Sequence, residues 1–169
     1  MSKRHRSLDE MDTRILEILQ KDCRIPLEQI ANKLRVPKST LHYRIKRLET
    51  EKIIEGYYAK VDAAKLGRDF ITITLIRTKS GPRAHKIVGK MLAQISGVCA
   101  VYFVLGETNF VVLAKSNNHE DFMEKLEKIM NMEQIERSST QVVAKVIKED
   151  PRIELEYFTS LYGKEKLSI

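Results

Sequence analysis

Residues 26–51, PLEQIANKLRVPKSTLHYRIKRLETE, decide the fold of the N-terminal part of this chain. The pattern predicts two short helices, each with one apolar side: Leu27, Ile30, Ala31 and Leu34 in the first, and Leu41, Ile45 and Leu48 in the second. Pro37 separates them because proline lacks an N–H and disfavours a helical conformation in the residue before it. Two such helices joined by a short turn, with a small residue at Ala31 where they would cross, are typical of a helix-turn-helix.

The second helix, expected over about Lys38–Glu51, has an outer side suited to nucleic acid. With its apolar side turned inward, the residues turned outward are Ser39, Tyr43, Lys46, Arg47 and Thr50, with Thr40 and His42 on the flanks. Hydroxyl groups can hydrogen-bond to base edges, and cations suit phosphates. Arg44 lies nearer the buried side, where its head group can reach a phosphate or an acid. The candidate DNA-contacting residues are Lys38, Ser39, Thr40, His42, Tyr43, Arg44, Lys46 and Arg47.

The residues around this pair of helices bear on whether it reads DNA. Asp9 is the expected N-cap of a preceding helix that runs through about Lys21. Residues 54–62 are expected to form a strand pair, the wing that often accompanies such helices. The wing favours a DNA-binding domain over the alternative, which is the solvated basic face of an ordinary three-helix bundle.

A different pattern begins near Ala63. It predicts strands over 70–78, 98–105, 109–115 and 135–148, and helices over 83–95 and 122–130. This order is the ferredoxin-like βαββαβ plan, with both helices on one face of an antiparallel sheet. The fold class is therefore α+β, divided into a winged helix-turn-helix at 1–62, a linker at 63–69, the ferredoxin-like domain at 70–150 and an extension at 151–169. The bare face of the sheet needs a cover, so we expect a homodimer.

The turn Gly106-Glu107-Thr108-Asn109 has two interpretations. It is a polar loop between apolar strands, which a plain hairpin explains. Alternatively, its backbone N–H groups and polar side chains bind the zwitterionic end of an amino acid, helped by the polar run 138–141.

Other classes of protein are disfavoured by the composition. The chain has 169 residues, a net charge of +7 and 43% hydrophobic residues, and no apolar stretch long enough for a membrane span. Its N-terminus lacks the apolar core of a secretory signal, so we expect a cytoplasmic protein with no membrane partner. Cys23 and Cys99 have no metal-ligand spacing around them and are expected to be free thiols. The four histidines are scattered, and no catalytic motif is present, so we expect neither an enzyme nor a bound cofactor or metal.

Four stretches of the sequence together resemble one family, namely residues 8–16 (LDEMDTRIL), 30–31 (IA), 39–49 (STLHYRIKRLE) and 53–57 (IIEGY). They are similar to the Lrp/AsnC, or feast/famine, transcriptional regulators, and the resemblance continues to about Asp150. It implies dimers that assemble into tetramers, octamers or higher forms, and an amino-acid effector bound between dimers. By that analogy the effector-binding residues are Gly106, Glu107, Thr108 and Asn109, assisted by Ser139 and Thr140.

The sequence departs from that family at four positions. Arg35 replaces the usual turn glycine, which requires either a positive φ or a different turn. Pro37 replaces a serine cap, Lys52 replaces a common glycine, and Asn109 replaces a frequent aspartate. The last change removes a charge that would pair with an ammonium group, although Glu107 can substitute.

Three functions remain open on the sequence. The leading one is a sequence-specific transcriptional regulator that responds to a small effector, expected to be an amino acid. A chromatin-like architectural DNA-binding protein without effector control shares the same DNA contacts. A tetrapyrrole decarboxylase of similar architecture is the third, and the basic helix argues against it. For residues 151–169, an added strand or arm against a neighbouring subunit and a tail without fixed structure are equal alternatives.

Overall fold

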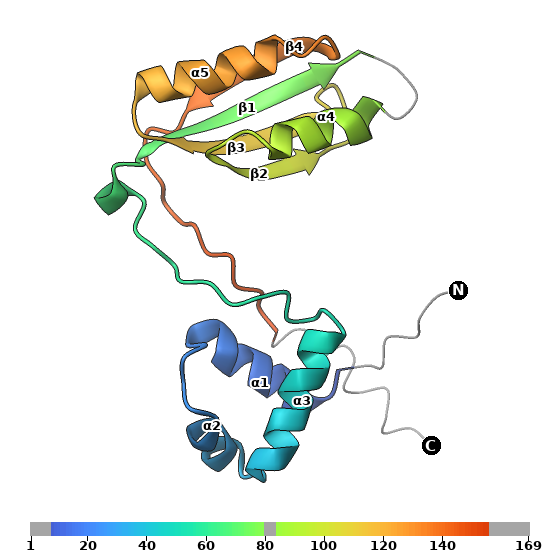
Figure 1. Cartoon of the computed structure of the whole chain (residues 1–169), viewed down its shortest axis with the longest axis vertical. Helices are drawn as coiled ribbons and strands as arrows, with labels where there is room; N and C mark the ends of the chain where they lie inside the picture. The colour runs from blue at the N-terminus through green and yellow to red at the C-terminus, as the bar shows by residue number, and fades with distance from the viewer. Residues whose placement is uncertain (1–7, 80–83, 156–169) are drawn as a thin grey trace. The chain divides into compact units, whose positions relative to one another are not determined.

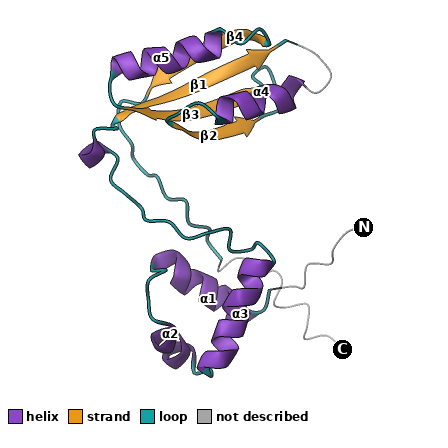
Figure 2. Ribbon diagram, viewed as in Figure 1, coloured by secondary structure: helices purple, strands orange, loops and turns teal. Residues whose placement is uncertain are grey.

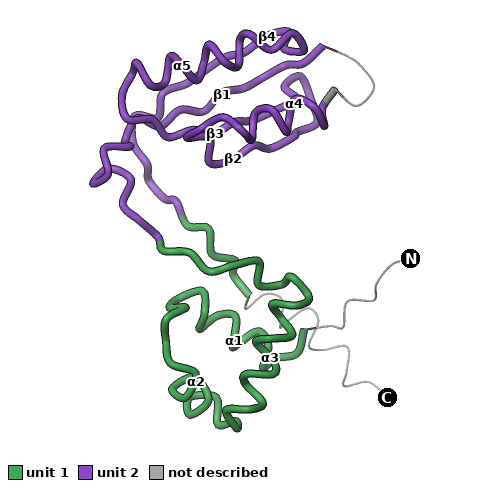
Figure 3. Tube along the Cα trace, in the orientation of Figure 1, with its two compact units in different colours: residues 1–59, 150–169 green, residues 60–149 purple. Residues whose placement is uncertain are grey.

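The structure is a computed structural model that describes residues 8–79 and 84–155. The chain divides into two compact units, residues 1–59 with 150–169, and residues 60–149 (Figure 3). The first contains the helices α1 (Glu10–Lys21), α2 (Leu27–Leu34) and α3 (Lys38–Thr50), and the second contains a four-stranded sheet with two helices (Figure 1). The order helix-turn-helix and then βαββαβ confirms the predicted α+β fold class.

Helix α1 begins where the sequence predicts, because Asp9 caps it. The Asp9 carboxylate accepts a hydrogen bond from the Asp12 N–H at 2.8 Å, and the Asp12 carboxylate accepts one from the Asp9 N–H at 3.2 Å. This reciprocal capping box satisfies two N–H groups that a helix start leaves unpaired. The three helices enclose one apolar core, whose buried members are Ile15, Leu16, Ile30, Ala31, Leu41, Ile45 and Leu48.

The turn between α2 and α3 gives Arg35 a positive φ, the first of the two alternatives expected at this position. This residue ends α2 in the left-handed region, with φ 54° and ψ 45°. Lys52, which follows α3, has a φ of 59° and takes the same conformation. Pro37 precedes α3, and no side chain caps that helix. Both non-glycine residues hold a backbone conformation that costs an L-residue about 1–2 kcal/mol.

The strand pair expected over 54–62 is absent, and this prediction is wrong. Residues 54–62 belong to no strand of the described chain. Gly56 does not take the positive φ that the favoured two-residue hairpin turns require. Instead, the Tyr57 hydroxyl donates to the Glu49 carboxylate at 3.0 Å, which fixes the start of this segment against α3.

The second unit is an antiparallel sheet in the order β2-β3-β1-β4, formed by β1 (Phe70–Thr78), β2 (Val98–Phe103), β3 (Phe110–Ser116) and β4 (Ile135–Val142). Helices α4 (Ala84–Ala93) and α5 (His119–Met130) lie on one face of it (Figure 2). The buried core lies between sheet and helices and consists of Ile76, Val88, Leu92, Ile95, Phe110, Val112, Ile129 and Met132.

Several elements of this unit differ from their predicted bounds. Helix α4 ends at Ala93 instead of 95, and β2 ends at Phe103 instead of 105. Helix α5 begins at His119 instead of Phe122, because the Asn118 side chain accepts a hydrogen bond from the Asp121 N–H at 2.9 Å and caps the helix. Strand β4 ends at Val142 instead of 148, where its ladder with β1 ends at Thr72, and one further hydrogen bond runs from the Val143 N–H to the Ile71 carbonyl at 2.9 Å.

The other face of the sheet carries apolar side chains that no helix of residues 8–79 and 84–155 covers. The alternation of β1 buries Thr72, Thr74 and Ile76 against the helices and turns Ile71, Ile73 and Leu75 to the opposite side. Leu75 pairs with Val111, and Val111 pairs with Tyr102, which is 60% exposed. We call this surface the bare face, and its apolar members are Ile71, Ile73, Leu75, Ala100, Tyr102, Val111 and Leu113.

No helix among the described residues is long and apolar enough to cross a membrane.

Candidate functional site

The outer row of α3 consists of exposed side chains, as the sequence predicts for most of its members. Lys38, Ser39, Thr40, His42, Tyr43 and Lys46 are all exposed, and Tyr43 retains 65% of its accessible surface. Opposite them, Leu41, Ile45 and Leu48 are buried. Within the described part of the chain, none of these six side chains takes part in a hydrogen bond or ion pair of the structure, so all are available to a ligand.

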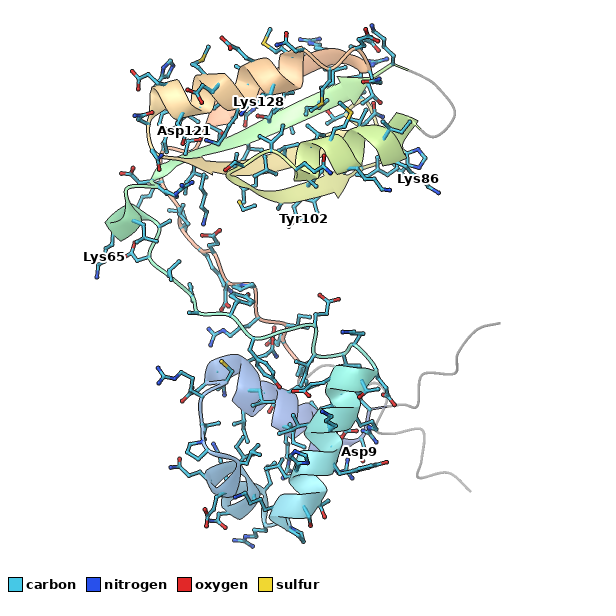
Figure 4. The ribbon with its side chains drawn as sticks, viewed as in Figure 1. Asp9, Lys65, Lys86, Tyr102, Asp121 and Lys128 are labelled. Carbon is cyan, nitrogen blue, oxygen red and sulfur yellow. The ribbon has the colours of Figure 1, made fainter. Side chains whose placement is uncertain are left out.

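Arg44 and Arg47 form a second row, which faces α1. The Arg44 guanidinium contacts the Asp9 carboxylate at 2.7 Å and the Asp12 carboxylate at 2.8 Å. Arg47 also pairs with Asp12, whose side chain is 1% exposed. In Figure 4, the labelled Asp9 lies beside α3. These four side chains form a charge cluster that joins α1 to α3.

The expectation that Arg47 faces outward is therefore wrong. Residues three apart on a helix share a side, so Arg47 follows Arg44 toward α1. The buried Asp12 needs paired cations, because an uncompensated carboxylate inside a protein is costly. Arg47 is half-buried, and its Nε atom lies buried without a hydrogen-bond partner. Of the two partners expected for Arg44, the structure shows the acid, in the form of Asp9 and Asp12.

The contact between Asp9 and Arg44 favours the ionised form of both side chains. Burial raises the pKa of Asp9, but the hydrogen bonds and the positive charge of Arg44 outweigh it and leave that pKa lowered. The hydrogen bonds that Arg44 donates to Asp9 in turn raise the pKa of Arg44, against the opposing effect of burial. The sequence identifies Asp9 only as a helix cap and does not identify Asp12 as a partner of α3. Asp12 lies too far along the chain from α3 for any local pattern to indicate the contact.

A shallow hollow of about 320 Å³ opens beside α3 in the first unit. The Tyr57 hydroxyl lies on it, and burial, followed by the hydrogen bond to Glu49, raises the pKa of Tyr57 to about 12. His42 and Lys46 line this hollow, so these two members of the outer row border it. The lining residues are Leu19, Cys23, Ile25, Leu27, His42, Ile45, Lys46, Glu49 and Tyr57.

The predicted effector loop connects β2 to β3. Gly106 is exposed and has a φ of 147°, which favours glycine. Glu107 is exposed, whereas Thr108 is half-buried. Asn109 already has a structural role, because its side-chain oxygen accepts hydrogen bonds from the Thr78 N–H at 2.8 Å and from the Thr78 hydroxyl at 3.2 Å.

Ser139 and Thr140 lie on β4, beyond β1 from this loop. As neighbours in a strand they point to opposite faces. Ser139 pairs with Leu75 on the bare face, while the Thr140 hydroxyl bonds to the Thr74 hydroxyl at 3.0 Å on the helix-covered face. One chain therefore does not bring the six predicted effector residues together into one site.

Cys23 and Cys99 are both free and exposed. In residues 8–79 and 84–155, no group of three or more His, Cys, Asp or Glu side chains is placed to hold a metal ion.

Family models match both parts of the chain. Residues 8–49 match the AsnC-type helix-turn-helix domain, and residues 70–153 match the Lrp/AsnC ligand binding domain. Over 147 residues the chain is 36% identical to an uncharacterized HTH-type transcriptional regulator of Pyrococcus abyssi, a match that covers 87% of this chain and 99% of that protein. It is 34% identical to the HTH-type transcriptional regulator FL11 of Pyrococcus furiosus, covering 84% of this chain and 93% of that protein.

Solved structures share the fold. The Escherichia coli AsnC structure has a TM-score of 0.78 at 22% identity and covers 85% of this chain and 97% of its own. A transcriptional regulator of Neisseria meningitidis, solved as a complex with L-Met, has a TM-score of 0.83 at 18% identity and covers 90% of this chain and 99% of its own. Both domain models, the relatives and the shared fold agree, and this chain belongs to the Lrp/AsnC family of transcriptional regulators, which are not enzymes.

Proposed function

We propose that this regulator binds specific DNA sites through the outer row of α3 and that a free amino acid controls its binding and assembly. The observation that carries the first part is the division of α3 into two polar rows. The inner arginines are committed to the acids of α1, whereas the outer side chains are exposed and without partners among the described residues. A recognition helix reads the major groove with such a row.

The roles on the outer row follow from its chemistry. Ser39, Thr40 and Tyr43 carry hydroxyl groups that can hydrogen-bond to base edges or to phosphates. Lys38 and Lys46 supply cations for phosphates, and His42 at the edge of the row can add a contact. Losing a base contact costs about 1–3 kcal/mol of discrimination, whereas losing a phosphate contact weakens binding to all sequences.

The test is selection of DNA sites from a random pool, followed by affinity measurements across salt concentrations. Ser39→Ala and Tyr43→Phe should relax base preference, since each removes a hydroxyl. Lys46→Ala should lower the slope of log affinity against log salt by about 1. Arg14→Ala, on an exposed side of α1, is the matched control. A chain that selects no site, with all variants behaving alike, would be an architectural DNA-binding protein instead.

The second part of the proposal concerns the effector. A related structure is described as an L-Met complex, and the exposed Gly106 and Glu107 offer backbone N–H groups and a carboxylate to a zwitterion. Because the loop and Ser139 lie on either side of β1, the site is completed by a second copy of the chain. Assembly and effector binding are then linked, and the bare face is the surface on which two copies meet.

Calorimetry with each of the twenty amino acids tests the effector. We expect one or a few to bind, and Glu107→Gln to weaken that binding by removing the partner of the ammonium group. Glu136→Gln is the matched control, because this exposed glutamate lies outside the loop. Absence of binding by all twenty contradicts amino-acid control and leaves the DNA-binding part intact.

A further inference from the structure

The segment that follows the sheet is part of the DNA-binding unit. Residues 150–155 belong to the same compact unit as the three helices, as the green trace in Figure 3 shows. The Gln20 carboxamide on α1 accepts a hydrogen bond from the Ile153 N–H at 2.7 Å and donates one to the Ile153 carbonyl at 2.9 Å. Leu155 packs against the apolar core of the helices. Residues 153–155 are therefore docked on the DNA-binding unit.

Glu149 is held in the other unit, four positions earlier. Its carboxylate accepts hydrogen bonds at both oxygens from the ammonium group of Lys115 on β3, each at 2.9 Å. Its backbone carbonyl accepts one from the Lys60 ammonium group at 3.2 Å. The Lys115 side chain is only 23% exposed, so this ion pair is partly shielded from water. Glu149, the last residue of the ligand-binding unit, is thus held in place within that unit.

The residues between the two anchors are preorganised. The Asp150 carboxylate accepts a hydrogen bond from the Arg152 N–H at 3.1 Å and pairs with the Arg152 guanidinium at 2.8 Å. Pro151, between them, has a fixed φ. A carboxylate held by a guanidinium and a backbone N–H is a charge-assisted arrangement. Three residues with this local order leave little slack between Glu149 and Ile153.

We propose that residues 149–153 form a strap that transmits effector occupancy from the ligand-binding unit to α1 of the DNA-binding unit. Residues 143–148 connect the strap to β4, the strand that carries Ser139 and Thr140, so the path from that strand to α1 runs along the chain itself. Helix α1 in turn holds α3 through the charge cluster. This inference rests on the proposed function, because it needs both an effector and a DNA site. It gives the two sites the physical connection that coupling requires.

The docking of the strap is tested first by hydrogen exchange in the full chain. Gln20→Ala removes both hydrogen bonds to Ile153. The backbone N–H of Ile153 should then exchange about 5- to 30-fold faster than in the wild type. Gln20→Glu keeps the acceptor and loses the donor, so an intermediate rate is expected. Gln29→Ala, an exposed glutamine on α2, is the matched control and should leave the rate unchanged. Equal rates in all four chains would overturn the docking.

Transmission is tested by the ratio of DNA affinities with and without a mixture of the twenty amino acids. In Gln20→Ala this ratio should fall toward one, while DNA affinity without amino acids and amino-acid binding by calorimetry stay at the wild-type level. A ratio equal to that of the wild type, with fast exchange at Ile153, overturns transmission. Wild-type chain that selects no DNA site contradicts the proposed function instead, and the exchange experiment still decides the docking.

Discussion

At the scale of single residues, the ion pairs of Arg47 and Arg14 differ in how much they contribute to stability. Arg47 pairs with the buried Asp12, whereas Arg14 pairs with Glu10 at the surface, where the two side chains are 59% and 64% exposed. Removing one partner of a buried pair leaves an uncompensated charge and costs up to about 3–5 kcal/mol. Removing an exposed helical pair costs about 0.3–0.5 kcal/mol.

We therefore expect Arg47→Ala to lower the free energy of unfolding by about 2–3 kcal/mol, somewhat below the full cost because Arg44 still pairs with Asp12. Arg14→Ala should change it by less than about 0.5 kcal/mol. Urea denaturation followed by circular dichroism measures both. In DNA binding, Arg47→Ala should leave the salt slope unaltered, in contrast to Lys46→Ala. A lowered slope with unchanged stability would place Arg47 on the DNA instead.

The lowered pKa of Asp9 predicts a pH dependence. A carboxyl group whose pKa is lowered by folding adds stability above its unfolded pKa of about 3.9, and this is lost as pH falls through the folded pKa. Asp9→Asn keeps a good helix cap and removes the charge that pairs with Arg44. The variant should be less stable than the wild type at pH 7, and the difference should be smaller at pH 3, below the unfolded pKa. Unfolding at both pH values measures this, and an equal difference at both would contradict it.

At the scale of elements, the turn before α3 shows a local rule that tertiary structure overrides. Arg35 takes a left-handed conformation that glycine adopts freely. Arg35→Gly should therefore stabilise the chain by up to about 1 kcal/mol, while Lys33→Gly inside α2 should destabilise it by about 1 kcal/mol. Thermal unfolding of both variants gives the comparison. Destabilisation by both would mean that the Arg35 side chain itself contributes a stabilising contact.

The elements also show which features of the fold can be predicted from the sequence. The limits of β1 and the start of α1 follow from local signals, namely alternation of side chains and the acidic cap. The outer row of α3 follows from helical spacing. The position of Arg47 does not, because it depends on a buried acid in another helix. The docking of Ile153 on Gln20 also depends on a distant partner, which a single sequence does not reveal. The sequence also predicts a strand pair over 54–62 that the structure lacks.

At the scale of the whole molecule, the proposed assembly rests on the sheet. Two helices bury one face, and the bare face leaves a row of half-buried and exposed apolar side chains across β2, β3 and β1. Apolar surface of this kind is stabilised when a second copy covers it, and a two-fold arrangement uses the same patch twice. The predicted effector residues also favour two copies, since those on β4 and those in the loop after β2 do not lie together within one chain.

Leu75→Lys places a charge at the centre of the bare face, opposite Val111. The single unit tolerates it, because that face is not part of the helix-covered core, but burial of an unpaired ammonium group between two copies is costly. We expect the variant to sediment as a monomer with unchanged secondary structure, to lose amino-acid binding and to bind DNA more weakly, because one recognition helix replaces two. Met130→Lys, at a 63% exposed position on α5, is the matched control and should remain assembled. A Leu75→Lys chain that still sediments as a dimer would place the interface on another surface and leave the bare face without a role in assembly.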